Sequence, residues 1–260
     1  MQSRENILVI TGEELRHQYF ANQINAHFPL AAIFTEASHY PAPPAGSEEE
    51  SGAWDWFFTR RAQYENRVFG TASQLPTVNP PPLIRIQKGK LNSPETAEAI
   101  KKCHPGFIAI FGTGMLEDKI LALFPERIFN LHVGLPDFYR GSSCNFWPIY
   151  EGRLEKLGAA VHSTSRGIDT GKIAAQTTIE LDSNDDEQTL MGKTLFAGVK
   201  LMISTIHNWR KDTLHLSHLA SPGNLYVRKD FTPRAVLRVR KMVESGELKH
   251  LIQKTQRDNH

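Results

Sequence analysis

The chain has 260 residues, 40% of them hydrophobic, which is enough to bury the core of one large domain or of one domain with an appendage. Its 30 basic and 28 acidic residues give a formal net charge of +2, so charge alone does not indicate nucleic acid as a partner. Cys103 and Cys144 are its two cysteines, too few for a disulfide framework and compatible with a reducing compartment.

Neither a signal peptide nor a membrane span is expected. The first residues, MQSRENILVI, hold a short apolar run without a small-residue cleavage site. No segment approaches the ~20 apolar residues that span a bilayer. We therefore expect a soluble protein of the cytoplasm that has no membrane partner.

Strand-like and helix-like patterns alternate from the N-terminus. The apolar run at 5–11 predicts a strand, and a helix is expected after it because Thr11 and Glu14 have capping-box spacing. Residues 30–36 predict a second strand, and the Pro-, Gly- and Glu-rich residues 38–50 predict a surface loop.

An aromatic segment follows this loop. We expect Trp54, Phe57 and Phe58 to face the domain core along a helix, with stacking on nucleic-acid bases as the alternative. Residues 83–102 then predict a strand, a turn and a helix that is capped near Ser93.

Two apolar strands are predicted in the middle of the chain, at 107–111 and 127–133, and a polar loop follows each of them. In an open α/β sheet, ligands bind at the carboxyl ends of the strands. The alternation of strands and helices predicts a Rossmann-like α/β domain, with a mainly parallel twisted sheet flanked by helices.

The last third of the chain adds further elements. Residues 158–181 predict two strands around a Gly-rich turn, and a long helix is expected at 187–209, after an acidic stretch that suits the helix dipole. A short extended piece and a basic amphipathic helix at 232–254 follow. We predict a catalytic domain at 1–210 and a small C-terminal extension at 211–260.

Asn130 and His132 form the first candidate site. Residues two apart in a strand share a face, so both side chains are expected together where the strand ends. Asp169 is a candidate to orient the imidazole, because Gly167 and Gly171 flank it in a turn and permit close backbone approach. On the residues alone, a satisfied hydrogen-bonding histidine remains the alternative.

Three motifs in this order resemble the folate-dependent formyltransferase family, which includes glycinamide ribonucleotide transformylase and methionyl-tRNA formyltransferase. The resemblance is close over the segment from about residue 105 to about residue 180 and looser at the Rossmann-like start. The motifs are Asn130-x-His132, the sequence Leu-Pro-x-x-Tyr-Arg-Gly that ends at Gly141, and Gly-Ile-Asp-Thr-Gly-x-Ile from Gly167, with Gln176 after it.

The resemblance implies transfer of a formyl group from 10-formyltetrahydrofolate to an amine without a metal, with Asn130, His132 and Asp169 as the catalytic set. This chemistry builds an oxyanion, which His132 and Asn130 would stabilise as hydrogen-bond donors. Asp169 would hold the ring and accept a proton through a water. The family has a serine in the loop where this chain has Gly134, so no loop hydroxyl is expected to contribute.

The resemblance also implies contacts with both substrates, mainly through two loops and the first helix. Met115 and Leu116 are equally compatible with ordinary core packing. The residues expected to line the pterin pocket are Gly114, Met115, Leu116, Ser165, Arg166, Gly167 and Ile168. The residues expected to contact the acceptor are Gly12, Arg16, His17, Tyr139, Arg140 and Trp147.

The predicted acceptor is a nucleotide-linked amino sugar, because SSCNFWPIYEG at 142–152 resembles a stretch of nucleotide-sugar N-formyltransferases. A tRNA acceptor is disfavoured, since about 55 residues follow the long helix, fewer than a separate domain needs; the basic tail helix keeps it open. Glycinamide ribonucleotide is disfavoured because Glu13 and Glu14 would repel a phosphate at the first helix. The C-terminal elements are candidates for homodimer contacts.

Other functions stay as alternatives. Glu36, at the end of the second predicted strand, suggests a nicotinamide dehydrogenase, but no Gly-x-Gly-x-x-Gly motif supports this class. A 10-formyltetrahydrofolate hydrolase would use the same triad with water as the acceptor. A non-enzymatic folate- or nucleotide-binding protein would bind without turnover.

Overall fold

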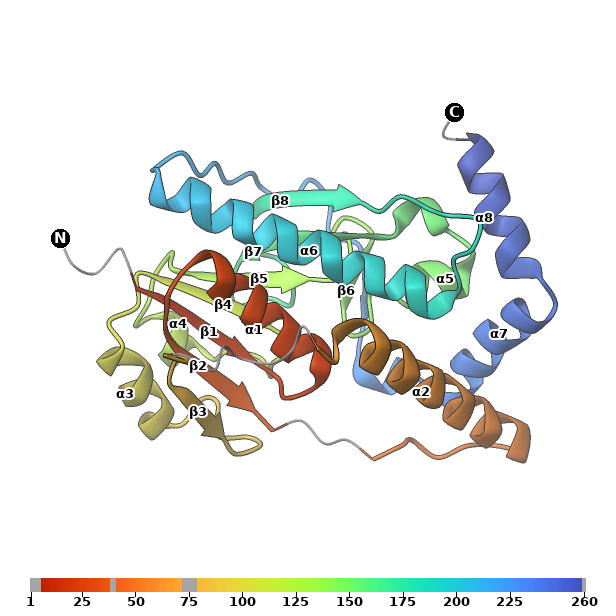
Figure 1. The fold of residues 1–260 in the computed structure, drawn as a ribbon, viewed down its shortest axis with the longest axis horizontal. Coiled ribbons are helices and arrows are strands. Elements are labelled where there is room, and N and C mark those ends of the chain that lie inside the picture. Colours follow the sequence, from red (N-terminus) through yellow and green to blue (C-terminus); the bar gives the residue numbers. More distant parts are fainter. Residues whose placement is uncertain (1–5, 38–40, 72–78, 259–260) are drawn as a thin grey trace.

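A seven-stranded sheet forms the centre of the computed structural model (Figure 1), which describes residues 6–37, 41–71 and 79–258. The strand order is β3, β2, β1, β4, β5, β7, β8. The strands are β1 (Ile7–Thr11), β2 (Leu30–Glu36), β3 (Leu83–Ile86), β4 (Phe107–Phe111), β5 (Ile128–His132), β7 (Gly158–Ser163) and β8 (Ile173–Thr178). The first five are parallel, whereas β7 runs antiparallel to β5 and β8 antiparallel to β7. This confirms the expected mainly parallel α/β sheet.

Helices cover both faces of this sheet. On one face, Val9 shares a buried cluster with Phe20 of α1 and Val199 of α6. On the other, Ile10 is buried with Ile100 of α3, so consecutive strand residues face opposite helical layers. The helices are α1 (Leu15–His27), α2 (Glu48–Phe69), α3 (Pro94–Lys102), α4 (Asp118–Leu121), α5 (Trp147–Glu151), α6 (Glu187–Arg210), α7 (Pro233–Glu244) and α8 (Glu247–Asp258). None of the helices described is both long and apolar enough to cross a bilayer.

The C-terminal segment packs against the rest of the chain. Its short strand β9 (Asn224–Tyr226) pairs in parallel with β6 (Tyr139–Gly141) in a separate two-stranded sheet. Val236 and Val239 of α7 are fully buried in one hydrophobic cluster with Phe57 of α2. The division into residues 1–210 and 211–260 stays a prediction.

The start of α2 differs from the sequence-based prediction. The acidic run expected in the loop at 38–50 forms the first turn of this helix, where the Ser47 hydroxyl accepts a hydrogen bond from Glu50 N at 3.2 Å. Carboxylates in the first turn interact favourably with the positive end of the helix dipole. Residues 38–40 of the predicted loop lie outside the described residues. Farther along α2, Phe57 is buried as expected, whereas Trp54 and Phe58 are half-buried.

Two other predictions about helix ends are wrong. Thr11 caps no helix, because its hydroxyl donates to the carbonyl of Phe111 at 2.8 Å and Glu14 is the N-cap of α1. The helix predicted at 232–254 is two helices, α7 and α8, since Gly246 between them has a φ of +81°. This left-handed conformation ends a helix and is readily adopted by glycine.

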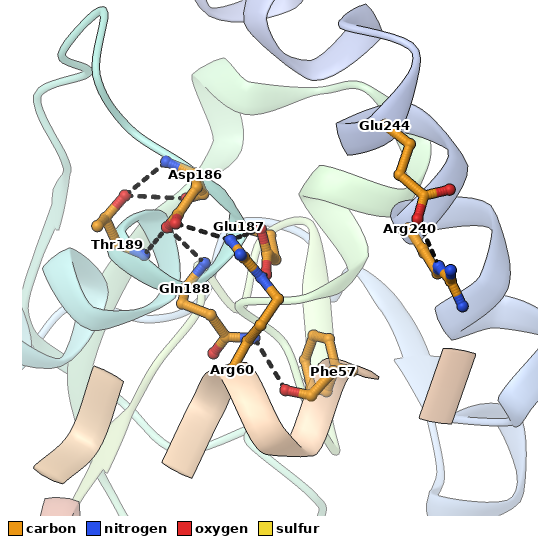
Figure 2. A network of polar contacts seen from close by, with 8 residues as sticks. All are labelled: Phe57, Arg60, Asp186, Glu187, Gln188, Thr189, Arg240 and Glu244. Carbon is orange, nitrogen blue, oxygen red and sulfur yellow. Dashed lines mark hydrogen bonds and ion pairs between the residues drawn. The ribbon is translucent and has the colours of Figure 1, made fainter. Parts of the chain in front are cut away.

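A buried carboxylate fastens α2 to the start of α6 (Figure 2). The side chain of Glu187 is 0% exposed and binds Arg60 twice, through Nε at 2.6 Å and Nη2 at 3.1 Å. Arg60 Nη2 also lies 2.8 Å from Asp186, the N-cap of α6. Gln188 adds a hydrogen bond to the carbonyl of Phe57 at 3.4 Å. The fork of one arginine therefore satisfies a carboxylate with no access to water.

Replacing Arg60 by alanine is expected to lower the free energy of unfolding by about 3–5 kcal/mol, because the buried Glu187 then lacks its cation. Urea unfolding followed by circular dichroism measures this. The matched control is Arg240→Ala, which removes a half-exposed i, i+4 pair with Glu244 (Figure 2) and is expected to cost about 0.3–0.5 kcal/mol. Equal losses in the two variants would contradict the role given to burial.

Candidate active site

A buried polar cluster lies where β5 ends. Asn130 and His132 occupy one face of this strand, as their spacing predicts, and Asp169 reaches both from the loop between β7 and β8. Asp169 Oδ2 lies 3.3 Å from His132 Nδ1, and Asp169 Oδ1 lies 3.5 Å from Asn130 Nδ2. The His132 and Asp169 side chains are 6% and 10% exposed. The structure therefore brings together the three residues of the predicted catalytic set.

Two more groups bind the Asp169 carboxylate. The backbone N–H of Gly141 donates to Oδ2 at 2.7 Å, and His162 Nε2 lies 3.2 Å from Oδ1. The other ring nitrogen of His162, Nδ1, lies 2.9 Å from the carbonyl of Ser163. Because a carbonyl only accepts, Nδ1 of His162 carries a proton. In a neutral ring Nε2 therefore accepts from Asn130 Nδ2 at 3.2 Å, and it donates to Asp169 only in an imidazolium. Asn130 thus contacts both Asp169 and His162.

His162 was not predicted from the sequence. This residue stands directly opposite Asn130 in the antiparallel pairing of β5 with β7, and in the sequence it follows the apolar part of a strand that ends at Ser163. Such a residue is equally typical of a core histidine that is merely hydrogen-bonded. The signal that identifies it is the register between two strands, which is not encoded locally.

The loop that carries Asp169 depends on close backbone approach. Asp169 itself has a φ of +50°, a left-handed conformation that aspartate tolerates better than most residues. A Cβ atom on Gly171 would lie 1.5 Å from the carbonyl oxygen of Ser163, and one on Gly167 would lie 2.3 Å from the hydroxyl of Thr170. Glycines on both sides are therefore required, as the sequence suggested, for the carboxylate to enter the cluster.

Burial and charge set the protonation of this cluster. Burial alone would raise the pKa of Asp169, but His132, His162 and the Gly141 N–H outweigh it and hold that pKa below its usual range. Burial lowers the pKa of His132, against the opposing effect of the Asp169 charge. Both ring nitrogens of His132 face oxygens, since Nε2 lies 3.0 Å from the carbonyl of Tyr139. A neutral ring donates to one of these oxygens and an imidazolium to both.

The two loops predicted to line the pterin pocket meet through an ion pair. Arg166 Nε lies 3.0 Å from Asp118 at the start of α4, next to the loop that follows β4. Asn92 holds that loop on both sides of Leu116, because its amide donates to Met115 O and accepts from Glu117 N, each at 2.8 Å. The loop is therefore fixed in shape by a side chain outside it.

The residues predicted for the pterin pocket differ in exposure. Met115 is 64% exposed, whereas Leu116 is buried in the core beneath β4. Gly114 N donates to the buried carboxylate of Glu36 at 2.6 Å, so the acid that suggested a dinucleotide site instead binds this loop. Ser165 bonds Thr170 within its own loop at 2.9 Å. Roles for these residues and for Gly167 and Ile168 stay predictions.

Three residues predicted for acceptor binding lie at the start of α1. Arg16 pairs with Glu14 and, at 2.8 Å, with Glu65. His17 is buried, and Cβ atoms on Gly12 and Gly112 would lie 2.4 and 2.2 Å from its ring nitrogens. Arg16 therefore already has carboxylate partners, and His17 fills the space between two loops. Contacts of Gly12, Arg16 and His17 with an acceptor stay predictions.

The other predicted acceptor residues are Tyr139 and Arg140, which lie next to the triad, and Trp147, which packs behind β6. Tyr139 and Trp147 are 1% and 3% exposed, and Trp147 Nε1 donates to Ser142 O at 2.8 Å. Arg140 Nε donates to Gly223 O at 2.9 Å, and its Nη1 lies 3.4 Å from Ile168 O. These side chains hold the walls of the site, and their contact with an acceptor stays a prediction.

Comparison with known proteins identifies the relatives of this chain. Residues 55–206 match a family model described as formyl transferase. A methionyl-tRNA formyltransferase from Desulforamulus reducens is 30% identical over 132 residues, which are 50% of this chain and 41% of that protein. The chain therefore matches less than half the length of this relative.

Solved structures of two acceptor classes share the fold. Phosphoribosylglycinamide formyltransferase from Anaplasma phagocytophilum aligns with a TM-score of 0.58 and 12% identity, covering 86% of this chain and 99% of that one. An N-formyltransferase from Helicobacter canadensis, in complex with folinic acid and dTDP-3-aminofucose, aligns with a TM-score of 0.53 and 17% identity, covering 89% and 78%. At these identities the likeness shows the fold alone.

Because two histidines are buried, we expect the free energy of unfolding to fall in acid. Burial, with Arg16 and Arg61 acting in the same direction, lowers the pKa of His17 well below its ordinary value. Between that lowered pKa and the unfolded value of about 6.5, the unfolded chain binds more protons, so the free energy of unfolding falls as pH is lowered. Urea unfolding at pH 7 and pH 5 is expected to show this loss, to which His132 contributes with the same sign.

The variant His17→Gln separates the His17 contribution. It is expected to reduce the difference in unfolding free energy between pH 7 and pH 5, whatever its effect on stability at pH 7. His27→Gln, at an exposed position in the last turn of the same helix, is the matched control and should leave that difference unchanged. An unaltered pH dependence in His17→Gln would refute the assignment.

Proposed function

The chain belongs to the formyl transferase family, and from this we propose that it transfers a formyl group from 10-formyltetrahydrofolate to the amine of a small acceptor. The observation that carries the proposal is the cluster of Asn130, His132 and Asp169 within the matched segment, at the carboxyl end of a central strand. That edge of an open α/β sheet is where ligands bind.

The geometry is suited to acyl transfer. Attack by the amine on the formyl carbon forms a C–N bond and an oxyanion, and the bond from that carbon to N10 of the folate then breaks. Asn130 supplies an N–H group for the oxyanion, and His132 supplies one when its ring exchanges the carbonyl of Tyr139 for the substrate oxygen. Asp169 is ionised and takes the proton lost by the amine through a water, from which it passes to N10.

The hydrogen bonds of the cluster indicate which donor turns to the oxyanion. Asn130 Nδ2 is 3.5 Å from Asp169 Oδ1, the longest contact of the carboxylate, whereas Gly141 N is 2.7 Å from Oδ2. A contact of 3.5 Å is at the limit of a hydrogen bond. Of the donors to Asp169, Asn130 therefore gives up the weakest hydrogen bond when it turns to the oxygen of the substrate.

The donor pocket is assigned to the loops on either side of the triad. Gly114, Met115 and Leu116 follow β4, and the loop from Ser165 to Ile168 leads to Asp169; the Arg166–Asp118 pair bridges them. The related enzyme from Helicobacter canadensis holds folinic acid, which supports a reduced folate as donor. The chemistry needs no metal, and within the described residues no group of three or more His, Cys, Asp or Glu side chains is placed to hold one.

We assign a nucleotide-linked amino sugar as the acceptor. The relative with dTDP-3-aminofucose bound supports this class, as does the motif at 142–152. A tRNA acceptor is the second candidate, because the curated relative acts on methionyl-tRNA by its name. Cytoplasmic location and a homodimer belong to the same proposal.

The decisive experiment measures release of tetrahydrofolate from 10-formyltetrahydrofolate, with and without a panel of nucleotide-linked amino sugars. Release that depends on one sugar, together with a formyl mass increment on that sugar, is the expected result. Release without any amine would replace the proposal by the hydrolase. Formylation of methionyl-tRNA alone would select the second acceptor, and binding of folate without release would favour a non-enzymatic protein.

Variants of the triad test the roles of its members. His132→Gln and Asp169→Asn are each expected to lower kcat roughly 10²–10³-fold, since each removes transition-state stabilisation. His162→Gln is expected to lose roughly tenfold, because His162 acts through Asp169 and Asn130. Circular dichroism checks the fold, and His27→Gln serves as the control. Near-normal kcat in His132→Gln or Asp169→Asn would reject the assignment.

A further inference from the structure

A short strand from beyond the family match completes the wall of the site. We call residues 223–226 the strap. Its Asn224 N donates to Phe138 O at 2.9 Å, and its Tyr226 O accepts from Ser142 N at 2.8 Å. These bonds seat the strap alongside β6, with Gly141 opposite Tyr226. The family match ends at residue 206, so the strap is an addition of this chain to the matched segment.

The strand beside the strap provides two backbone groups to the triad. The carbonyl of Tyr139 lies 3.0 Å from His132 Nε2, and the N–H of Gly141 donates to Asp169 Oδ2 at 2.7 Å. β6 has three residues and no strand partner among the described residues other than β9. Its position therefore depends on the strap, and the orientation of His132 and Asp169 depends on its position.

One carboxylate joins the strap to β6 through side chains. Glu151 accepts a hydrogen bond from Tyr139 OH at 2.7 Å and another from Tyr226 OH. The ring of Tyr226 stacks on Trp147, with centroids 4.2 Å apart and planes 14° apart. Burial and the Glu151 carboxylate raise the pKa of Tyr226 to about 12 and also raise the pKa of Tyr139, so both phenols donate at physiological pH.

The contact between the two strands tolerates no side chain at two glycines. Gly141 has a φ of +94°, and a Cβ atom there would lie 2.0 Å from Tyr226 O. A Cβ atom on Gly223 would lie 2.2 Å from the carbonyl carbon of Phe138. Arg140 also donates to Gly223 O at 2.9 Å. The strap thus fits Tyr139–Gly141 through backbone hydrogen bonds, through the side chain of Arg140 and through close packing at two glycines.

We propose that the strap positions the catalytic triad, with Tyr226 as a positioning residue that acts through Glu151 and β6. The catalytic part of this inference rests on the proposed formyl transfer, whereas the structural part does not. Loss of the Tyr226 hydroxyl loosens β6 and with it the acceptor of His132 Nε2 and the donor to Asp169. The expected consequence is a lower kcat, because small displacements of reacting groups are costly.

Tyr226→Phe tests this with two readouts. Its kcat is expected to fall roughly tenfold while the KM values of donor and acceptor stay within about twofold. Independently of turnover, the imidazole N–H resonance of His132 in ¹⁵N NMR, assigned with His132→Gln, is expected to shift or broaden. The control is Tyr150→Phe, in the same hydrophobic cluster, whose hydroxyl makes none of the bonds to Glu151 or β6.

A second variant keeps the test decisive. Gly223→Ala inserts a methyl group against Phe138 and is expected to alter the His132 resonance more strongly than Tyr226→Phe does. If the wild-type chain shows no turnover on any acceptor but the two variants show the expected NMR changes, formyl transfer is rejected. The positioning of His132 by the strap is then still supported. Unchanged His132 resonance and kcat in both folded variants, or equal effects in Tyr150→Phe, would overturn the proposal.

Discussion

A carboxylate with little access to water must be surrounded by donors, and the site of this protein is arranged around that need of Asp169. Four residues from three strands meet its two oxygens: Asn130 and His132 from β5, Gly141 from β6, and His162 from β7. The antiparallel β7 and the left-handed turn at Asp169 bring the last of these contacts into place. The same charge that needs donors lies against an imidazole, and in the proposed mechanism it accepts a proton.

Two other carboxylates hold elements of the structure together away from the triad. Glu187 begins α6 with no exposure and is matched by Arg60 of α2, and the half-buried Glu151 is matched by two phenols. Arg60 and Tyr226 come from distant segments, so each acid fixes one element against another. Breaking the Glu187 pair is more costly than losing a surface pair, because the remaining charge cannot be hydrated.

The sequence predicted the sheet, its helices and the three residues at its centre because those features have local signatures. Asn130 and His132 are two apart in a strand, and the glycines around Asp169 announce a turn with close approach. His162 and Tyr226 were not predicted, because their roles depend on register between strands that are remote in the chain. The start of α2 at Glu48 was not predicted, because an acidic run after proline and glycine is typical of both a loop and a first helical turn.

The parallel pairing of β6 with β9 has a consequence for the order in which this protein folds. Arg140 and Gly223, which are bonded across this pairing, stand 83 residues apart in the chain. The strap is made after every strand of the seven-stranded sheet, so it becomes available to pair with β6 only later. During synthesis from the N-terminus, the sheet, with its Asn130 and His132, can assemble before the strap has left the ribosome. The triad should therefore reach its final geometry as one of the last events of folding.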